Sequence, residues 1–444
     1  MLLLATAPLA LAAAPVVAPV ADAACATPAV LHALAGRAPA PFPEVLVAPP
    51  GLGVRRSGSA PPGPGKQVYG TPFTRHLDTA NFTINWESGA ATDAAAQAAA
   101  DALEGAWTVF LDEEGWAPPV SSDTYLVWVV LDPSLGGSTG YTTEYVTDEF
   151  PEGYPVIYLN PDYAGDAPFW GALAAHEFMH TLQYRVREWQ GTDPSESWYW
   201  EASATWASEL ADPDRDGHQY TSAWYADQPG LRYDSQVGFH QYGMFVLNAW
   251  LDEWVGTNGM REVWSLGEER QDDTWDTLLA EIGDVSADEL WAGFAGAYGN
   301  EQLAESDLYT RAAVVGVLEH GASGMLPRLG TAYYRVDADA TVQAEGPVVL
   351  AGADGAGPVV HVAAGDRLAV TGSEDGAAYT LRVTDPDADT DTDTDIDEDG
   401  DTALVDDNDA EDPRGGCGCH GSAGAGSGAL GLLALGLLGA RRRR

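Results

Sequence analysis

The fold is decided by the stretch Ala174-Ala-His176-Glu177-Phe-Met-His180-Thr-Leu-Gln-Tyr184, which contains the pattern His-Glu-x-x-His. The segment is predicted to be helical. On a helix, residues four positions apart lie one above the other on the same face. His176 and His180 can therefore both direct an imidazole nitrogen at one ion. Glu177, one step round from His176, can reach a water molecule bound to that ion.

This pattern has two interpretations. In zinc peptidases, two such histidines bind the metal and the glutamate acts as general base. The alternative is an ordinary buried helix whose two histidines are satisfied by hydrogen bonds. The rest of the chain must decide between a metal site and a structural core.

Composition limits the possible functions. The chain has 444 residues, enough for two domains and a sizeable core, and a formal net charge of -46. An acidic surface disfavours nucleic acid as a partner, because phosphates require Lys and Arg. The three cysteines, Cys25, Cys417 and Cys419, all lie outside the long middle of the chain. Any zinc site in that middle must therefore be built from His and carboxylate side chains.

The segments before the motif predict a small α+β lobe. Phe82–Trp86 alternates like a strand, and a helix capped by Asp93 follows it. Tyr125–Leu131 is a continuous apolar run typical of a buried strand, Gly136–Tyr141 is predicted to be a loop, and 156–159 a second short strand. This order places a sheet in front of the active-site helix.

A third metal ligand is expected from the next helix, predicted over Trp198–Leu210. Catalytic zinc takes three protein ligands and leaves one position to water. Glu201 is the best candidate, because an unpaired carboxylate among so many aromatic and small residues would be costly. Glu196 and Glu209 are the alternatives.

Two residues further along are candidates for stabilising an oxyanion. His240 and Tyr242 lie at the start of a predicted helix, and zinc peptidases add a His or Tyr donor for the tetrahedral oxyanion. The alternative for Tyr242 is a core aromatic at a helix start. This mostly helical lobe would face the α+β lobe across a cleft with the metal at its floor.

At this point the residues resemble a known family. His176-Glu-Phe-x-His180, followed by Trp200-Glu201-Ala-x-Ala-Thr-Trp206, is similar to the gluzincin class of zinc metallopeptidases, and more narrowly to metallopeptidases of myxobacteria. The similarity extends from Tyr69 to Tyr334. The resemblance implies a zincin-like fold, with a small sheet lobe, a helical lobe and the active-site helix between them.

Residue by residue, the resemblance implies His176, His180 and Glu201 as zinc ligands and Glu177 as catalytic base. There is one departure from the family pattern. Better-known gluzincins have an acidic residue four positions after the ligand Glu, where it orients the first His, and this chain has Thr205 there. Glu209 is the alternative residue for that task.

The ends of the chain predict export. Residues 1–23 are apolar and end in small residues, as secretory signals do. Near the other end, Cys417 and Cys419 precede an apolar stretch at 423–440 and four terminal arginines. This arrangement resembles the myxobacterial C-terminal sorting signal (MYXO-CTERM), which implies processing near Cys417 and attachment to the cell surface. A single membrane-spanning anchor is the alternative.

The remaining segments complete the predicted organisation. Short strands parted by Gly and Asp turns predict a β-sandwich of structural or spacing role. The acidic tract beyond it contains Asp395-x-Asp397-x-Asp399-Gly-Asp401 and Asp406, which match part of an EF-hand-like loop and make calcium a second cofactor hypothesis. The predicted division is a signal peptide at 1–23, a Pro/Gly-rich linker or pro-segment at 24–66, a metallopeptidase domain at 67–310, a β-sandwich at 311–384, an acidic disordered linker at 385–413 and a sorting or anchor segment at 414–444.

The sequence thus predicts an exported, surface-attached zinc metalloendopeptidase that acts on a protein or peptide substrate. Two rivals stay open. One is a non-catalytic surface protein that uses a zincin-like fold for adhesion or binding. The other is a metal-dependent hydrolase acting on a non-peptide amide.

Overall fold

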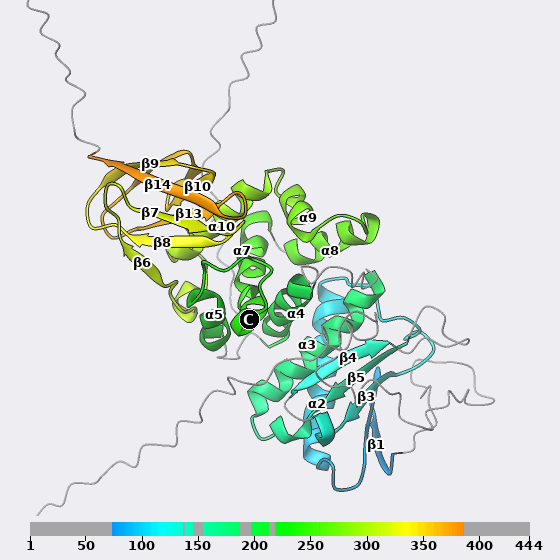
Figure 1. Ribbon diagram of the computed structural model, residues 1–444. Helices are drawn as coiled ribbons and strands as arrows, with labels where there is room; N and C mark the ends of the chain where they lie inside the picture. The colour runs from blue at the N-terminus through cyan, green and yellow to red at the C-terminus, as the bar shows by residue number, and fades with distance from the viewer. Residues whose placement is uncertain are drawn as a thin grey trace, which may run out of the picture. The chain divides into compact units, whose positions relative to one another are not determined.

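The computed structural model describes residues 73–135, 138–144, 154–186, 197–212, 218–256 and 258–385, which fold as a mixed α+β protein (Figure 1). Its first part is a five-stranded sheet with the order β1-β2-β3-β5-β4. The central pairs, β2 with β3 and β3 with β5, are parallel, whereas β1 and β4 are antiparallel edge strands. The strands are β1 (Arg75–Asp78), β2 (Phe82–Trp86), β3 (Val127–Leu131), β4 (Gly140–Glu144) and β5 (Pro155–Leu159).

The predicted strands and helix of this lobe are present. β2, β3 and β5 are buried along their whole length, as expected of parallel strands covered on both faces. Helix α2 (Asp93–Trp107) follows β2, but its N-cap is Thr92 and not the predicted Asp93. Thr92 has extended backbone angles, and its hydroxyl accepts a hydrogen bond from the Ala95 amide at 3.1 Å. Asp93 is already helical and pairs with Arg75.

The prediction of a loop over Gly136–Tyr141 is wrong at its end, because β4 begins at Gly140. β4 is short, is rich in Gly and Thr, and pairs with a single neighbour, β5. Such a strand lacks the apolar alternation by which half-buried strands are recognised. β4 contacts the motif helix and places Thr142 beside it.

Helix α3 (Ala167–Val186) carries the His-Glu-x-x-His motif and packs against β4, β5 and α2. Asp166 caps it by accepting a hydrogen bond from the Phe169 amide at 3.2 Å. Phe178 anchors its other face, with ring centroids 5.0 Å from Phe82 and 6.0 Å from Phe110. The motif therefore lies in the middle of a twenty-residue helix that is held by the sheet lobe.

The next helix, α4 (Ser197–Ala211), packs on α3 more extensively than on any other element. Large buried aromatic side chains fill a helical core around it, among them Trp198 of α4 itself, Trp264 and Trp275. The other helices of this part are α5 (His218–Ala226), α6 (His240–Gly243), α7 (Phe245–Val255), α8 (Gly259–Glu269), α9 (Trp275–Ile282) and α10 (Ala287–Gly299).

The predicted β-sandwich is present from residue 314 onward. Its two sheets have the orders β11-β10-β13-β8-β6 and β12-β9-β14-β7, and Leu350, Val370 and Leu381 lie between them. The strands are β6 (Val314–Val317), β7 (Ser323–Leu326), β8 (Thr331–Arg335), β9 (Ala340–Glu345), β10 (Val348–Gly352), β11 (Gly355–Gly357), β12 (Val359–Val362), β13 (Arg367–Gly372) and β14 (Ala377–Thr384).

The first of these sheets shares a core with the helices. α10 packs on β10 and β13, and Tyr333 of β8 is fully buried with its hydroxyl 3.1 Å from that of Tyr225 on α5. Arg328 also pairs with the buried Asp276 of α9 at 2.6 Å. A fragment that ended at residue 310 would expose this shared core to water.

Several predictions fall on residues outside the described ranges. These are the signal peptide, the linker or pro-segment at 24–66, the alternative ligand Glu196, the EF-hand-like stretch at 395–406 and the sorting segment with Cys417. Within the described ranges, no helix has the length and apolar character needed to cross a membrane.

Candidate metal centre

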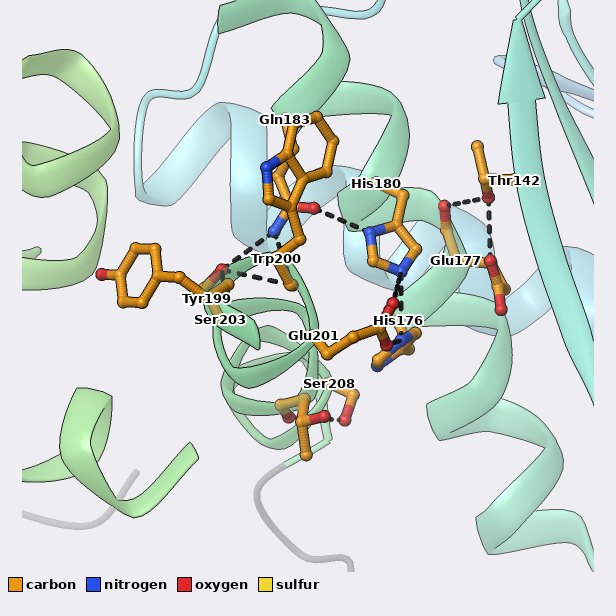
Figure 2. Close-up of polar contacts among 11 residues, drawn as sticks. Thr142, His176, Glu177, His180, Gln183, Tyr199, Trp200, Glu201, Ser203 and Ser208 are labelled. Atoms are coloured by element: carbon orange, nitrogen blue, oxygen red, sulfur yellow. Dashed lines mark hydrogen bonds and ion pairs between the residues drawn. The ribbon is translucent and has the colours of Figure 1, made fainter. Parts of the chain in front are cut away.

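Three predicted ligands converge between α3 and α4 (Figure 2). His176 and His180 lie one turn apart on α3, and their Nε2 atoms are 3.2 Å from each other. From α4, Glu201 Oε2 lies 3.1 Å from His176 Nε2, and Glu201 Oε1 lies 3.5 Å from His180 Nε2. His180 and Glu201 are fully buried, and His176 is 7 % exposed.

These distances fit a metal ion. Zinc–ligand bonds of about 2.0–2.1 Å in a tetrahedral site separate ligand atoms by about 3.4 Å, close to the three distances observed. A fully buried carboxylate such as Glu201 also needs a positive partner to offset its loss of hydration. The group could therefore bind a metal ion, and two imidazoles with one carboxylate are donors suited to a transition metal.

His180 is held in the form that a metal requires. Its Nδ1 lies 2.7 Å from Oε1 of Gln183, an oxygen that can only accept, so Nδ1 carries the proton and Nε2 a lone pair. Burial lowers the pKa of His180 to about 4, while the charge of Glu201 opposes the shift. The imidazole is thus neutral at neutral pH. Sequence reasoning missed Gln183, although its place three residues after His180 on the same helix face was a usable signal.

Glu177 is held by the edge strand β4. The Thr142 hydroxyl lies 2.8 Å from the Glu177 carbonyl oxygen and 2.9 Å from its carboxylate Oε2. Gly140 passes so close that a Cβ there would lie 2.8 Å from the Tyr158 carbonyl oxygen and 3.1 Å from Glu177 Oε1. β4 thereby holds the carboxylate of Glu177, the residue that directly follows His176 in the sequence.

The two oxyanion candidates have different neighbours. The ring of Tyr242 lies 6.1 Å from that of His176, so Tyr242 borders the metal centre. The ring of His240 lies 5.7 Å from that of Tyr225, and burial lowers the pKa of His240 to about 4. A hydrogen bond to the Trp224 backbone opposes this lowering. By position, Tyr242 is the better placed of the two.

The residues considered for orienting His176 lie further along α4. Thr205 comes one turn after Glu201, and within the described residues its Oγ1 has no hydrogen-bond partner. Glu209 comes two turns after Glu201, is buried, and lies outside the group of possible ligands. An orienting contact is observed on the second histidine, whose Nδ1 lies 2.7 Å from Gln183 Oε1.

Comparison with known proteins adds a family without an activity. Residues 66–346, well over half of the chain, match the model of a family of unknown function, DUF6055. The chain belongs to this family, and the match includes α3, α4 and the sandwich as far as β9. No curated protein matches the chain.

Proposed function

We propose that this member of the DUF6055 family is an exported zinc metalloendopeptidase on a zincin-like fold. The observation that carries the proposal is the buried group of His176, His180 and Glu201 with Glu177 beside it. A site used only for structure has no need of the extra carboxylate. The resemblance of both helices to the gluzincin class supports the same function.

Each side chain has a role in this proposal. His176 and His180 would bind the ion through Nε2, and Glu201 would bind it through its carboxylate. A bound zinc ion supplies Lewis acidity, which polarises a scissile carbonyl and acidifies water. Zinc is the metal proposed, because this donor set with one open position is typical of catalytic zinc.

Glu177 would move the proton. Its carboxylate takes a proton from the attacking water and returns it to the leaving amine as the peptide bond breaks. Thr142 and Gly140 hold this carboxylate in place, so little reorganisation is needed during the reaction. Tyr242 is the proposed donor to the oxyanion, on the ground of its place beside His176.

The zincin-like fold is supported by the arrangement around α3. A sheet with an antiparallel edge strand packs on the motif helix, and α4 brings the third ligand back to it. Export and surface attachment are proposed from the sequence at 1–23 and 414–444. The resemblance to zinc metallopeptidases makes a protein or peptide the proposed substrate.

The test compares the full chain with its Glu177→Gln variant. We expect one zinc per chain in both, chelator-sensitive cleavage of a peptide library by the parent, and turnover lower by about 10²–10⁴-fold in the variant. Glu268→Gln is the matched control, because Glu268 is an exposed glutamate on α8. Metal content is measured by mass spectrometry and cleavage by peptide sequencing.

Two outcomes would contradict the proposal. If Glu177→Gln cleaved at the parent rate, Glu177 would not be the base. If the parent bound no metal and cleaved nothing, a non-catalytic surface module would be favoured instead.

A further inference from the structure

We infer that Gln183 is a positioning residue that aligns two metal ligands at once, His180 on its own helix and Glu201 on the next. The inference rests on the proposed metal site but not on peptide cleavage. It arises from a single buried amide whose two ends contact different helices (Figure 2).

The orientation of this amide follows from its partners. Gln183 Nε2 lies 3.1 Å from the carbonyl oxygen of Trp200, which can only accept a hydrogen bond. The NH₂ group must therefore point at α4, and the amide oxygen must point at His180 Nδ1, 2.7 Å away. The reversed amide would place two acceptors against each other in a site that water does not reach.

The oxygen end selects the tautomer of His180. Because it accepts from Nδ1–H, it leaves the lone pair on Nε2, the atom that faces His176 and Glu201. Partners of this kind commonly orient the imidazole ligands of metal sites and raise their basicity. An apolar residue at position 183 would leave both tautomers of His180 accessible.

The nitrogen end holds the backbone beside Glu201. Trp200 directly precedes Glu201, so the bond to its carbonyl fixes the first atoms of the peptide that carries the third ligand. The same NH₂ group lies 2.9 Å from Ser203 Oγ. Ser203 in turn donates to the Tyr199 carbonyl at 2.5 Å and accepts from Trp264 Nε1 at 3.1 Å.

All members of this chain of hydrogen bonds are buried, so each lost contact leaves a polar group without water to replace it. His180 and Glu201 belong to different helices, yet their ligand atoms must stay about 3.4 Å apart for a tetrahedral ion. Gln183 joins the two helices at the level of both ligands. Its loss should loosen the metal without unfolding either helix.

The first measurement uses the unmodified full chain without metal. Long-range ¹H–¹⁵N spectra of histidine-labelled protein should show His180 protonated at Nδ1, with the signal assigned by its loss in His180→Asn. A His180 protonated at Nε2 would overturn the inference, and this result does not depend on the folding of any Gln183 variant.

The second measurement uses Gln183→Met, an unbranched apolar replacement of similar length. We expect the Nδ1–H preference to be lost, zinc affinity to fall by about 10–100-fold, and the absorption bands of the Co²⁺-loaded protein to shift. Gln183→Glu keeps an acceptor for Nδ1 and should restore the tautomer. Ser203→Ala is the comparison variant: it removes one partner of the network but keeps the His180 contact, so its loss of zinc affinity should be smaller than that of Gln183→Met.

The outcomes separate this inference from the proposed function. Unchanged zinc affinity and tautomer in Gln183→Met would overturn the inference and leave the peptidase proposal standing. A parent chain that binds zinc with the expected tautomer but cleaves no peptide would contradict the peptidase proposal and leave the inference about Gln183 standing. A loss of affinity in Ser203→Ala equal to that in Gln183→Met would reduce Gln183 to a packing role.

Discussion

The two sides of the metal centre differ in how they are built. We call one the inner side and the other the outer side. The inner side comprises His180, Gln183, Ser203 and Trp264, and the outer side comprises Thr142, His176, Glu177 and Tyr242. On the inner side every side chain is fully buried and joined by hydrogen bonds. On the outer side, His176 and Tyr242 keep 7 % and 6 % of their surface exposed.

This difference suggests a division of work. The inner side is fully buried and hydrogen-bonded, as is needed to hold an ion in fixed geometry. The outer side brings together the Glu177 carboxylate, strand β4 and the Tyr242 phenol, and within it His176 and Tyr242 keep some exposed surface. Changes on the inner side should therefore act on metal retention, and changes at Thr142, Glu177 or Tyr242 should act on turnover. His176 is itself a proposed ligand, so its loss should reduce both.

The largest effect is expected from the inner side. His180→Ala removes a proposed ligand. If about 10–16 kcal/mol of zinc binding is shared among the three protein ligands, the loss is about 3–5 kcal/mol, or roughly 10²–10⁴-fold in affinity. Competition with a chelator of known affinity measures it. Zinc affinity within threefold of the parent would remove His180 from the ligand set.

A smaller effect is expected from Tyr242→Phe on the outer side. If Tyr242 is the proposed oxyanion donor, its loss should lower kcat by about 10²-fold, whereas zinc affinity should be unchanged because the ring remains. His240→Gln is the comparison variant and should keep the parent kcat. The reverse result, with kcat lost in the His240 variant alone, would exchange the roles of the two residues.

Gly140→Ala tests the contact between β4 and Glu177. The added Cβ would lie 2.8 Å from the Tyr158 carbonyl oxygen and 3.1 Å from Glu177 Oε1, so both must shift by some tenths of an ångström. We expect about a 10-fold lower kcat with zinc still bound, because general bases are sensitive to small displacements. Gly105→Ala on α2 is the control, since its Cβ would meet no atom within 4 Å. Equal kcat values in the two variants would separate β4 from catalysis.

The smallest effect concerns the pH dependence of stability and the buried residue His240. The pKa of His240 is about 4 in the folded chain and about 6.5 in the unfolded chain, so the unfolded state binds the proton first as pH falls. The contribution of neutral His240 to the free energy of unfolding should thus be fully present above pH 6.5 and should be lost as pH falls toward 4. Between pH 7.5 and 5.5, this residue should account for about 1 kcal/mol.

Chemical denaturation of the parent and His240→Gln at both pH values checks this expectation. The variant should lose less stability on acidification than the parent. Equal losses in the two proteins would mean that His240 is not held neutral in the folded state.

Much of the architecture could be predicted from local pattern. The strand Phe82–Trp86, the motif helix and the helix carrying Glu201 follow from periodicity and apolar content, which depend on nearby residues alone. The N-cap was misplaced by one residue, because Thr92 and Asp93 are both good caps and only their backbone angles separate them. β4 was missed because an edge strand of Gly and Thr has no apolar signature.

The sequence by itself determined the helix that carries His176, His180 and Glu177, because the spacing of these residues follows from 3.6 residues per helical turn. It also limited the third ligand to a few glutamates. Only the tertiary structure decided that Glu201 meets both histidines, that β4 holds Glu177, and that Gln183 joins His180 to α4. These contacts depend on how separate elements pack, and packing is set by many distant side chains together.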